Sequence, residues 1–343
     1  MLFRERLLMA MAEHAAEVEA SAFWIFGPGQ GALRSESLKA QSKNDVLVET
    51  IASGVSRGTE TLVFKGLVPK SQHDRMRAPF QVGDFSFPVK YGYASVGRVI
   101  AGGGELKGQR VFCLHPHQDR FVVPADAVIP VPPNVASGRA VLAANMETAL
   151  NGLWDAPPRI GDRISVIGCG VVGALSACLA AGHPGVHVEV IDTNPRKAAI
   201  ARALGLTFVA PDEATPDADL VIHASGRPEG LRTAFEIAGF EATILDLSWY
   251  GDREVALPLG ENFHSRRLKL ISSQVGSIAP AMRLRKSHRD RLELALTLLA
   301  DQRYDVLLSP PRHFSQLPSI LAELSEGRDD VMCQPIVYRQ TST

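Results

Sequence analysis

Short runs in which apolar and polar residues alternate fill the first part of the chain and predict β-strands. Gly and Pro separate these runs, as they do at the turns of β-rich domains. The clearest runs cover residues 45–50, 93–100 and 109–114. We therefore expect residues 21–146 to form a barrel-like β domain.

From Glu147 onward the pattern changes, because short apolar runs now alternate with segments of helical periodicity. An apolar helix at 147–154 precedes the first of these runs, and further helices are expected at 194–205 and 228–238. Strands that are joined by helical crossovers pair in parallel, so the alternation predicts a doubly wound parallel sheet. The strand candidates are 163–167, 187–192, 206–210, 219–225, 242–248 and 268–273.

The end of the chain returns to the first domain in this interpretation. Amphipathic helices at 289–300 and 314–326 precede an apolar run at 335–339, which we expect to join the β domain as a strand. The sequence thus predicts an α/β dinucleotide-binding domain over 147–302, inserted into a β-rich domain made of 21–146 and 303–343. Residues 1–20 are expected to form a short amphipathic helix or an appended extension outside this fold.

The motif with the most specific chemistry is Gly-x-Gly-x-x-Gly, directly after the first strand of the α/β domain. Gly168 permits the tight turn, Gly170 lets the backbone approach a diphosphate, and Gly173 lets helix and strand pack closely. Val171 and Val172 lie at the start of the helix, whose N-terminus is an anion site. The alternative is that the glycines serve packing only.

A second feature strengthens the case for a dinucleotide site. Asp192 ends the next apolar run, about 20 residues after the third glycine, where the acid of this fingerprint binds the adenine ribose. Its charge would repel a 2′-phosphate, so NAD is favoured over NADP. Arg196 lies close by in the sequence and works against this preference.

Composition limits the class of protein and its partners. The 343 residues are 45% hydrophobic and 21% charged, as in ordinary globular proteins, and the net charge is −1. Nucleic acid and membranes are therefore not expected partners. The four cysteines are scattered without a Cys-x-x-Cys pair, which argues against disulfides and a thiolate zinc site and favours the reducing cytoplasm.

Three short segments carry a family resemblance. Ser-Gly-Val-Ser-Arg-Gly-Thr-Glu at 53–60, Tyr-Gly-Tyr-Ala-Ser-Val-Gly at 91–97 and Asn-Met-Glu-Thr-Ala-Leu at 145–150 resemble the metal-ligand segments of zinc alcohol dehydrogenases. With the domain order, they make residues 21–340 similar to the medium-chain dehydrogenase/reductase superfamily. That resemblance implies a GroES-like β-rich catalytic domain and an inserted Rossmann sheet. Within the superfamily, the first two segments look most like the bacteriochlorophyllide hydroxyethyl dehydrogenases, which oxidise a secondary alcohol on a large ring substrate.

The resemblance also implies that the catalytic zinc is absent. The position of the first zinc cysteine holds Ser56, that of the histidine holds Tyr93, that of the following acid holds Ala94, and the third ligand falls near Asn145. Zinc in such a site prefers Cys sulfur and His nitrogen, which these residues do not supply. The four-cysteine structural zinc lobe is missing too. The chain therefore resembles a zinc-less branch of the superfamily.

The same resemblance assigns further contacts to the cofactor. Arg57 stands where the family commonly places an arginine on the diphosphate, although an exposed surface arginine is the simpler alternative. The ends of the fourth and sixth strands lie where ligands collect at a parallel sheet. We expect these strand ends, Ser225, Gly226, Ser272 and Ser273, to line the nicotinamide half of the site.

Without zinc, a side chain must handle the proton on the substrate oxygen. Tyr93 is the first candidate, with a packed barrel tyrosine as the alternative. His115 and His117, on a loop after a strand, are the next, against a solvent-exposed pair. Thr59 is a further candidate from the first segment.

Other polar residues have alternative interpretations. Glu60, His115, His117 and Glu147 could hold a displaced metal, although their spacing matches no template. His223 is interpreted as a satisfied core histidine, and Lys90 as a solvated charge at a strand edge.

The sequence therefore predicts a zinc-independent, NAD-linked oxidoreductase that transfers a hydride between nicotinamide and an alcohol or ketone. A quinone or enoyl reductase is the second hypothesis, and a non-catalytic dinucleotide-binding protein on the same scaffold is the third. The substrate is expected to be a small molecule of unknown identity. The run 268–278 near the sheet edge resembles the segment through which the superfamily forms homodimers through its Rossmann domains.

Overall fold

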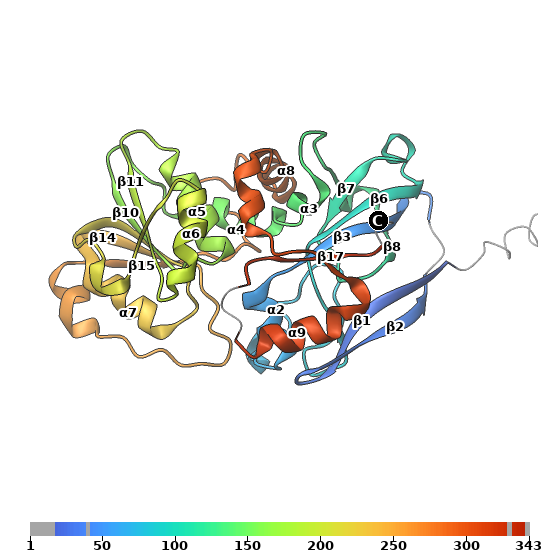
Figure 1. Cartoon of the computed structure of the whole chain (residues 1–343), viewed down its shortest axis with the longest axis horizontal. Coiled ribbons are helices and arrows are strands. Elements are labelled where there is room, and N and C mark those ends of the chain that lie inside the picture. The colour runs from blue at the N-terminus through green and yellow to red at the C-terminus, as the bar shows by residue number, and fades with distance from the viewer. Residues whose placement is uncertain (1–17, 39–41, 328–330, 340–343) are drawn as a thin grey trace, which may run out of the picture.

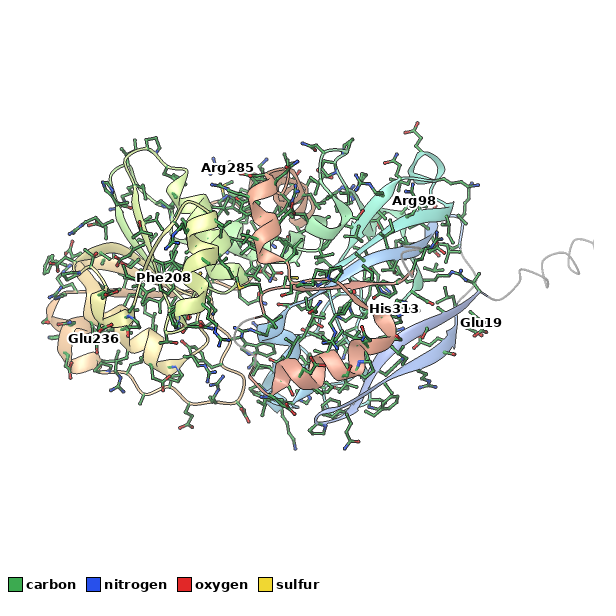
Figure 2. The ribbon with its side chains drawn as sticks, viewed as in Figure 1. Glu19, Arg98, Phe208, Glu236, Arg285 and His313 are labelled. Carbon is green, nitrogen blue, oxygen red and sulfur yellow. The ribbon has the colours of Figure 1, made fainter. Side chains whose placement is uncertain are left out.

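The computed structural model describes residues 18–38, 42–327 and 331–339. The two predicted lobes are visible in Figure 1, with the β domain on one side and the α/β domain on the other. Most of the predicted extension falls on residues 1–17 and lies outside the described part of the chain. Its last two residues, Glu19 and Ala20, instead belong to the first strand, so that end of the prediction is wrong. Charged side chains such as Glu19, Arg98 and Glu236 point outward from both lobes (Figure 2). Within the described residues, no helix has the length and apolarity needed to span a bilayer.

The α/β domain contains a six-stranded sheet in which every pairing is parallel. The strand order is β12-β11-β10-β13-β14-β15, which is the 3-2-1-4-5-6 order of a doubly wound dinucleotide fold. The predicted sheet is therefore confirmed. The strands are β10 (Arg163–Ile167), β11 (His187–Ile191), β12 (Thr207–Val209), β13 (Ala218–His223), β14 (Ala238–Asp246) and β15 (Lys269–Ser272).

Helices cover both faces of this sheet (Figure 1). Small residues dominate helix α5 (Val171–Ala181), so this helix packs closely on the sheet and buries Ala174, Ala177 and Ala180 completely. Pro228 occupies the first turn of helix α7 (Pro228–Ile237), where the helix needs no backbone N–H donor from it. The helices are α4 (Ala143–Asp155), α5 (Val171–Ala181), α6 (Ala198–Ala203), α7 (Pro228–Ile237) and α8 (His288–Leu298).

In the part of the chain that the structure describes, the β domain consists of two sheets and three short α-helices. The larger sheet runs β16-β17-β3-β6-β7-β9, with β8 also on β3, and the smaller runs β2-β1-β5-β4. Its strands are β1 (Glu19–Gly27), β2 (Gln30–Ser37), β3 (Asp45–Val55), β4 (Val82–Gly83), β5 (Val89–Lys90), β6 (Ser95–Gly102), β7 (Arg110–Cys113), β8 (Arg120–Pro124), β9 (Ile129–Pro130), β16 (Arg312–His313) and β17 (Gln334–Val337). Its helices are α2 (Arg57–Phe64), α3 (Ser137–Ala140) and α9 (Leu317–Ser325).

The predicted return of the chain is confirmed, because β17 pairs antiparallel with β3 in the β domain. Helix α9 buries Leu317, Ile320 and Leu321 in the apolar core between the sheets. The segment 314–326 is not one helix, since a 3-10 turn at Phe314–Gln316 precedes α9.

The alternating run at 93–100 predicted that Tyr93 lies on a strand, and this prediction is wrong. Strand β6 begins at Ser95, and Tyr93 follows Gly92, whose φ is +131°. A Cβ on Gly92 would lie 2.8 Å from the Cδ2 atom of His117, so only glycine fits there. This turn directs Tyr93 toward α2 rather than into the ladder.

Candidate active site

The glycine-rich turn has the geometry that its sequence predicts. Gly168 has a φ of +103°, and a Cβ on Gly173 would lie 1.9 Å from the carbonyl oxygen of Gly168. Gly170 differs, because a Cβ there would meet no atom of a non-adjacent residue within 4 Å. Helix α5 starts at Val171, and no side chain caps it. The turn therefore leaves space for a ligand at the helix N-terminus, which fits a diphosphate.

Asp192 lies directly after β11 and faces this turn. Its Oδ2 atom accepts a hydrogen bond from the Cys169 N–H at 2.7 Å, and its Oδ1 atom accepts one from the Asn194 N–H at 2.9 Å. Its Oδ2 atom also lies 3.0 Å from the Nζ atom of Lys197, and both side chains are largely buried. The carboxylate is thus in place for a ribose, but a buried cation partly neutralises it.

The predicted nicotinamide-side residues all lie at the carboxyl edge of the sheet, and several already have protein partners. The Ser225 hydroxyl lies 2.6 Å from the Nε2 atom of His223, and the Gly226 N–H donates to the Ser248 hydroxyl at 3.1 Å. The Ser273 hydroxyl donates to Asp155 at 2.6 Å, and Ser272 is the last residue of β15.

His223 is a satisfied core histidine, as predicted. It is fully buried, and its Nδ1 atom lies 2.9 Å from the Oδ1 atom of Asp246. Tyr250 donates to the Oδ2 atom of Asp246 at 2.9 Å, and these interactions with His223 hold the pKa of Asp246 below its usual value despite burial. The sequence did not predict the contact between His223 and Asp246, because the two residues lie on different strands.

In the β domain, Ser56, Thr59 and Tyr93 meet at the start of α2. Burial and the nearby Glu60 carboxylate raise the pKa of Tyr93 well above its ordinary value, and hydrogen bonds with the Ser56 and Thr59 hydroxyls lower it by a smaller amount. Tyr93 is therefore a neutral phenol at neutral pH. Arg57 is the first residue of α2 and is half-exposed.

His117 lies deeper than a loop histidine should. Its side chain is 1% exposed, with the Nε2 atom 2.8 Å from the Oε2 atom of Glu60 and the Nδ1 atom 2.7 Å from the Ser53 hydroxyl. The other oxygen of Glu60 accepts the Ser56 N–H at 2.8 Å. His117 therefore reaches the Tyr93 region through Glu60.

His115 is buried in a different environment. Its ring stacks on Phe121 at 3.9 Å between centroids and on Phe80 at 5.8 Å. Its Nδ1 atom donates to the Pro116 carbonyl at 2.9 Å, and burial lowers the pKa of His115 to about 3. At neutral pH it is an uncharged, stacked imidazole, which favours a packing role.

The four residues that could hold a displaced metal do not form one group in the described part of the chain. Glu60 and His117 are in contact, whereas Glu147 pairs with the buried Arg291 at 3.0 Å. The prediction for Lys90 is wrong. Lys90 is not a solvated charge, since it is 6% exposed and pairs with Glu36 at 2.7 Å. Glu36 lies on β2, the strand that pairs with β1, and the sequence pattern did not predict this strand.

Ser56 and Tyr93, at two positions that resemble zinc ligands of alcohol dehydrogenases, do not fit zinc. Ser56 and Tyr93 supply hydroxyl oxygens that bond to each other, and the Glu60 carboxylate is bonded to His117. Among the residues that the structure describes, no three His, Cys, Asp or Glu side chains form a possible metal group. Cys sulfur and His nitrogen are the usual zinc ligands in such a site, and Ser56 and Tyr93 supply neither.

Comparisons with known proteins agree with this architecture. No known family model matches the chain. The chain is 27% identical over 227 residues to the 2-desacetyl-2-hydroxyethyl bacteriochlorophyllide A dehydrogenase of Cereibacter sphaeroides, an alignment that covers 60% of this chain and 66% of that protein, just under two thirds.

Solved structures share the whole fold. L-idonate 5-dehydrogenase from Escherichia coli superposes with a TM-score of 0.77 at 15% identity, covering 94% of this chain and 99% of that one. A protein from E. coli CFT073 described as a short chain alcohol dehydrogenase, complexed with NADH, superposes with a TM-score of 0.73 at 16% identity, covering 93% and 99%. Other structures of this fold are complexed with NADP or NADP(H). The predicted combination of a GroES-like domain and a Rossmann domain is confirmed.

Proposed function

We propose that this member of the medium-chain dehydrogenase/reductase superfamily is a zinc-independent oxidoreductase that interconverts an alcohol and a ketone with a nicotinamide cofactor. The observation that carries the proposal is the open glycine turn before α5 in a chain where Ser56 and Tyr93, at two of the expected zinc-ligand positions, are hydrogen-bonded hydroxyl groups. The nicotinamide, when bound, supplies or takes up the hydride.

The residues that would hold the cofactor follow from the site. The α5 N-terminus with Gly168, Gly170, Val171, Val172 and Gly173 would bind the diphosphate, and Arg57 would add a charged donor from the β domain. Asp192 would bind the adenine ribose. The strand ends at 225–226 and 272–273 would flank the nicotinamide.

Tyr93 would handle the proton on the substrate oxygen. A phenol with a raised pKa remains protonated at neutral pH, so it can donate a hydrogen bond to a ketone and then a proton to the alkoxide that forms. Thr59 and Ser56 orient the phenol by hydrogen bonding. Because the ligand positions lack nitrogen and sulfur, the proposed reaction proceeds without zinc.

The contact between Asp192 and Lys197 favours a second candidate. A neutralised carboxylate repels a 2′-phosphate less, so NADPH could bind as well. An NADPH-linked quinone or enoyl reductase needs only a donor that stabilises an enolate, and Tyr93 is suited to that task too.

Cofactor choice tests this point directly. We expect NADH to bind more tightly than NADPH, and Asp192→Ala to narrow the gap by weakening NADH, because the ribose hydroxyls lose their acceptor. Lys197→Met should widen the gap, since the uncompensated carboxylate repels the 2′-phosphate more strongly. Fluorescence titration of both reduced cofactors measures each dissociation constant. Tighter NADPH binding by the parent protein would support the second candidate instead.

Assembly is a further expectation. Strand β15 ends the sheet order, and Leu270 on it is 40% exposed, so the edge is open to pairing with another copy. We expect a homodimer through the Rossmann domains, measured by light scattering at micromolar concentration. Lys269→Pro should disrupt it by removing a ladder donor. A monomeric parent protein would contradict this expectation.

Turnover decides the proposed function as a whole. NADH oxidation should be detected with at least one ketone whose reduction gives a secondary alcohol, in a panel that includes large ring substrates. Tight NADH binding without turnover of any carbonyl, quinone or enone would favour a non-catalytic dinucleotide-binding protein.

A further inference from the structure

A line of buried hydrogen-bonding side chains starts beside Tyr93 and crosses the β domain. Glu60 lies 2.8 Å from the Nε2 atom of His117, whose Nδ1 atom lies 2.7 Å from the Ser53 hydroxyl. That hydroxyl lies 2.9 Å from the hydroxyl of Tyr338, which follows β17. Each group can both accept and donate a proton, so the line is continuous for proton transfer.

The inner members of the line are almost completely buried. Glu60, His117 and Ser53 are at most 2% exposed, whereas Tyr338 is half-buried and stacks on Phe314. A buried carboxylate is costly unless it is paired, and the only charged or titratable side chain bonded to Glu60 in the described residues is His117. His117 therefore supplies the side-chain partner that the buried Glu60 carboxylate needs.

We propose that the Glu60–His117 pair, with Ser53 and Tyr338, is the store that returns a proton to Tyr93 after each reduction. The inference rests on the proposed role of Tyr93 as the donor. Glu60 and His117 act through Tyr93 and do not touch the substrate, so they are positioning residues. The hydroxyl of Ser56 or Thr59, both bonded to Tyr93, would pass the proton between the phenol and Glu60.

The step balances. In ketone reduction the carbonyl carbon takes the hydride that the reduced nicotinamide would supply, and the C=O π bond opens. The O–H bond of Tyr93 breaks as its proton bonds to the substrate oxygen. Tyr93 regains a proton from the Glu60–His117 pair, and the pair regains one from solvent through Ser53 and Tyr338. The reaction consumes one ketone, one hydride and one solvent proton. Alcohol oxidation runs the same steps in reverse.

Charge gives the pair its influence on Tyr93. Tyrosinate and the Glu60 carboxylate would be two anions in a buried site, so Glu60 raises the pKa of Tyr93 in addition to the larger effect of burial. The other titratable groups that face Glu60 are Tyr91, Cys333 and Tyr338, and burial raises the pKa of each. His115, an uncharged neighbour of His117, completes the set. A proton that enters the pair therefore removes the repulsion when Tyr93 ionises.

Glu60→Gln tests the proposal, because it keeps an acceptor for the Ser56 N–H and removes the charge. The pKa of Tyr93 should fall, so the alkaline limb of kcat/KM for ketone reduction should move to lower pH and alcohol oxidation should begin at lower pH. Ultraviolet titration of tyrosinate, taken as the difference between each protein with and without Tyr93→Phe, should show the same shift without turnover. Glu189→Gln removes a buried carboxylate bonded to Ser165 in the other domain and should leave both readouts unchanged.

Ser53→Ala breaks the line with a smaller change, should Glu60→Gln not fold. Its kcat should fall by roughly tenfold with an increased solvent isotope effect, while KM and NADH affinity stay the same. Unshifted pH profiles and tyrosinate titration in Glu60→Gln, or unchanged kcat and isotope effect in Ser53→Ala, would overturn the relay. If either negative result is found and Tyr93→Phe is still inactive, the proposed function stands and only the relay fails.

Discussion

Replacing Tyr93 by Phe should lower the turnover of ketone reduction by about 100-fold or more, the size usual for loss of one general acid. The ring and its packing remain, but the proton on the substrate oxygen loses its donor. NADH affinity should be nearly unchanged, because the cofactor contacts that we propose lie at the α5 turn and the ends of the sheet strands. Steady-state kcat and the NADH dissociation constant, measured on the same preparation, separate the two effects.

Tyr304→Phe is the matched control, because Tyr304 is also a buried tyrosine but lies in the apolar core beside Arg303. Its removal should alter stability only. Full turnover in Tyr93→Phe would remove Tyr93 from the chemistry.

Gly173→Ala should destabilise the Rossmann domain and abolish cofactor binding together. The new Cβ would overlap the Gly168 carbonyl oxygen at 1.9 Å, and that oxygen belongs to the backbone, which has little freedom to move. Overpacking of this kind costs about 1–3 kcal/mol of the free energy of unfolding, and more where backbone must shift. Denaturant unfolding and NADH titration measure the two losses.

Gly170→Ala separates binding from folding. Its Cβ would meet no atom of a non-adjacent residue within 4 Å, and the Gly170 φ of −84° suits alanine, so stability should hold. The methyl group would occupy the space that we assign to the diphosphate, and NADH should bind about tenfold more weakly or worse, roughly 1.4 kcal/mol. Unchanged NADH affinity in Gly170→Ala would argue against the assigned diphosphate position.

The fold could be predicted well because its signals are local. The Gly-rich turn needs a positive φ at Gly168 and close packing at Gly173, and both requirements appear directly as residue types. Alternating strands and helices then indicate the parallel sheet, and the apolar run at 335–339 indicated the return to the β domain.

Side-chain partners were harder to predict, because they join residues that are far apart in the sequence. Glu60 and His117 are 57 positions apart, and His223 and Asp246 are 23 apart. Lys90 was misjudged because its partner lies on the unrecognised strand β2. Lys197 is the exception, since it lies only five positions after Asp192 and a search for nearby cations beyond Arg196 would have found it.

Metal content measured together with turnover tests the central claim most directly. Protein purified without added metal and treated with a strong chelator should contain far less than one zinc per chain by mass spectrometry, and it should keep its full rate of NADH-dependent ketone reduction. Stoichiometric zinc in the purified protein, with activity that is lost to the chelator and restored by zinc, would contradict the account.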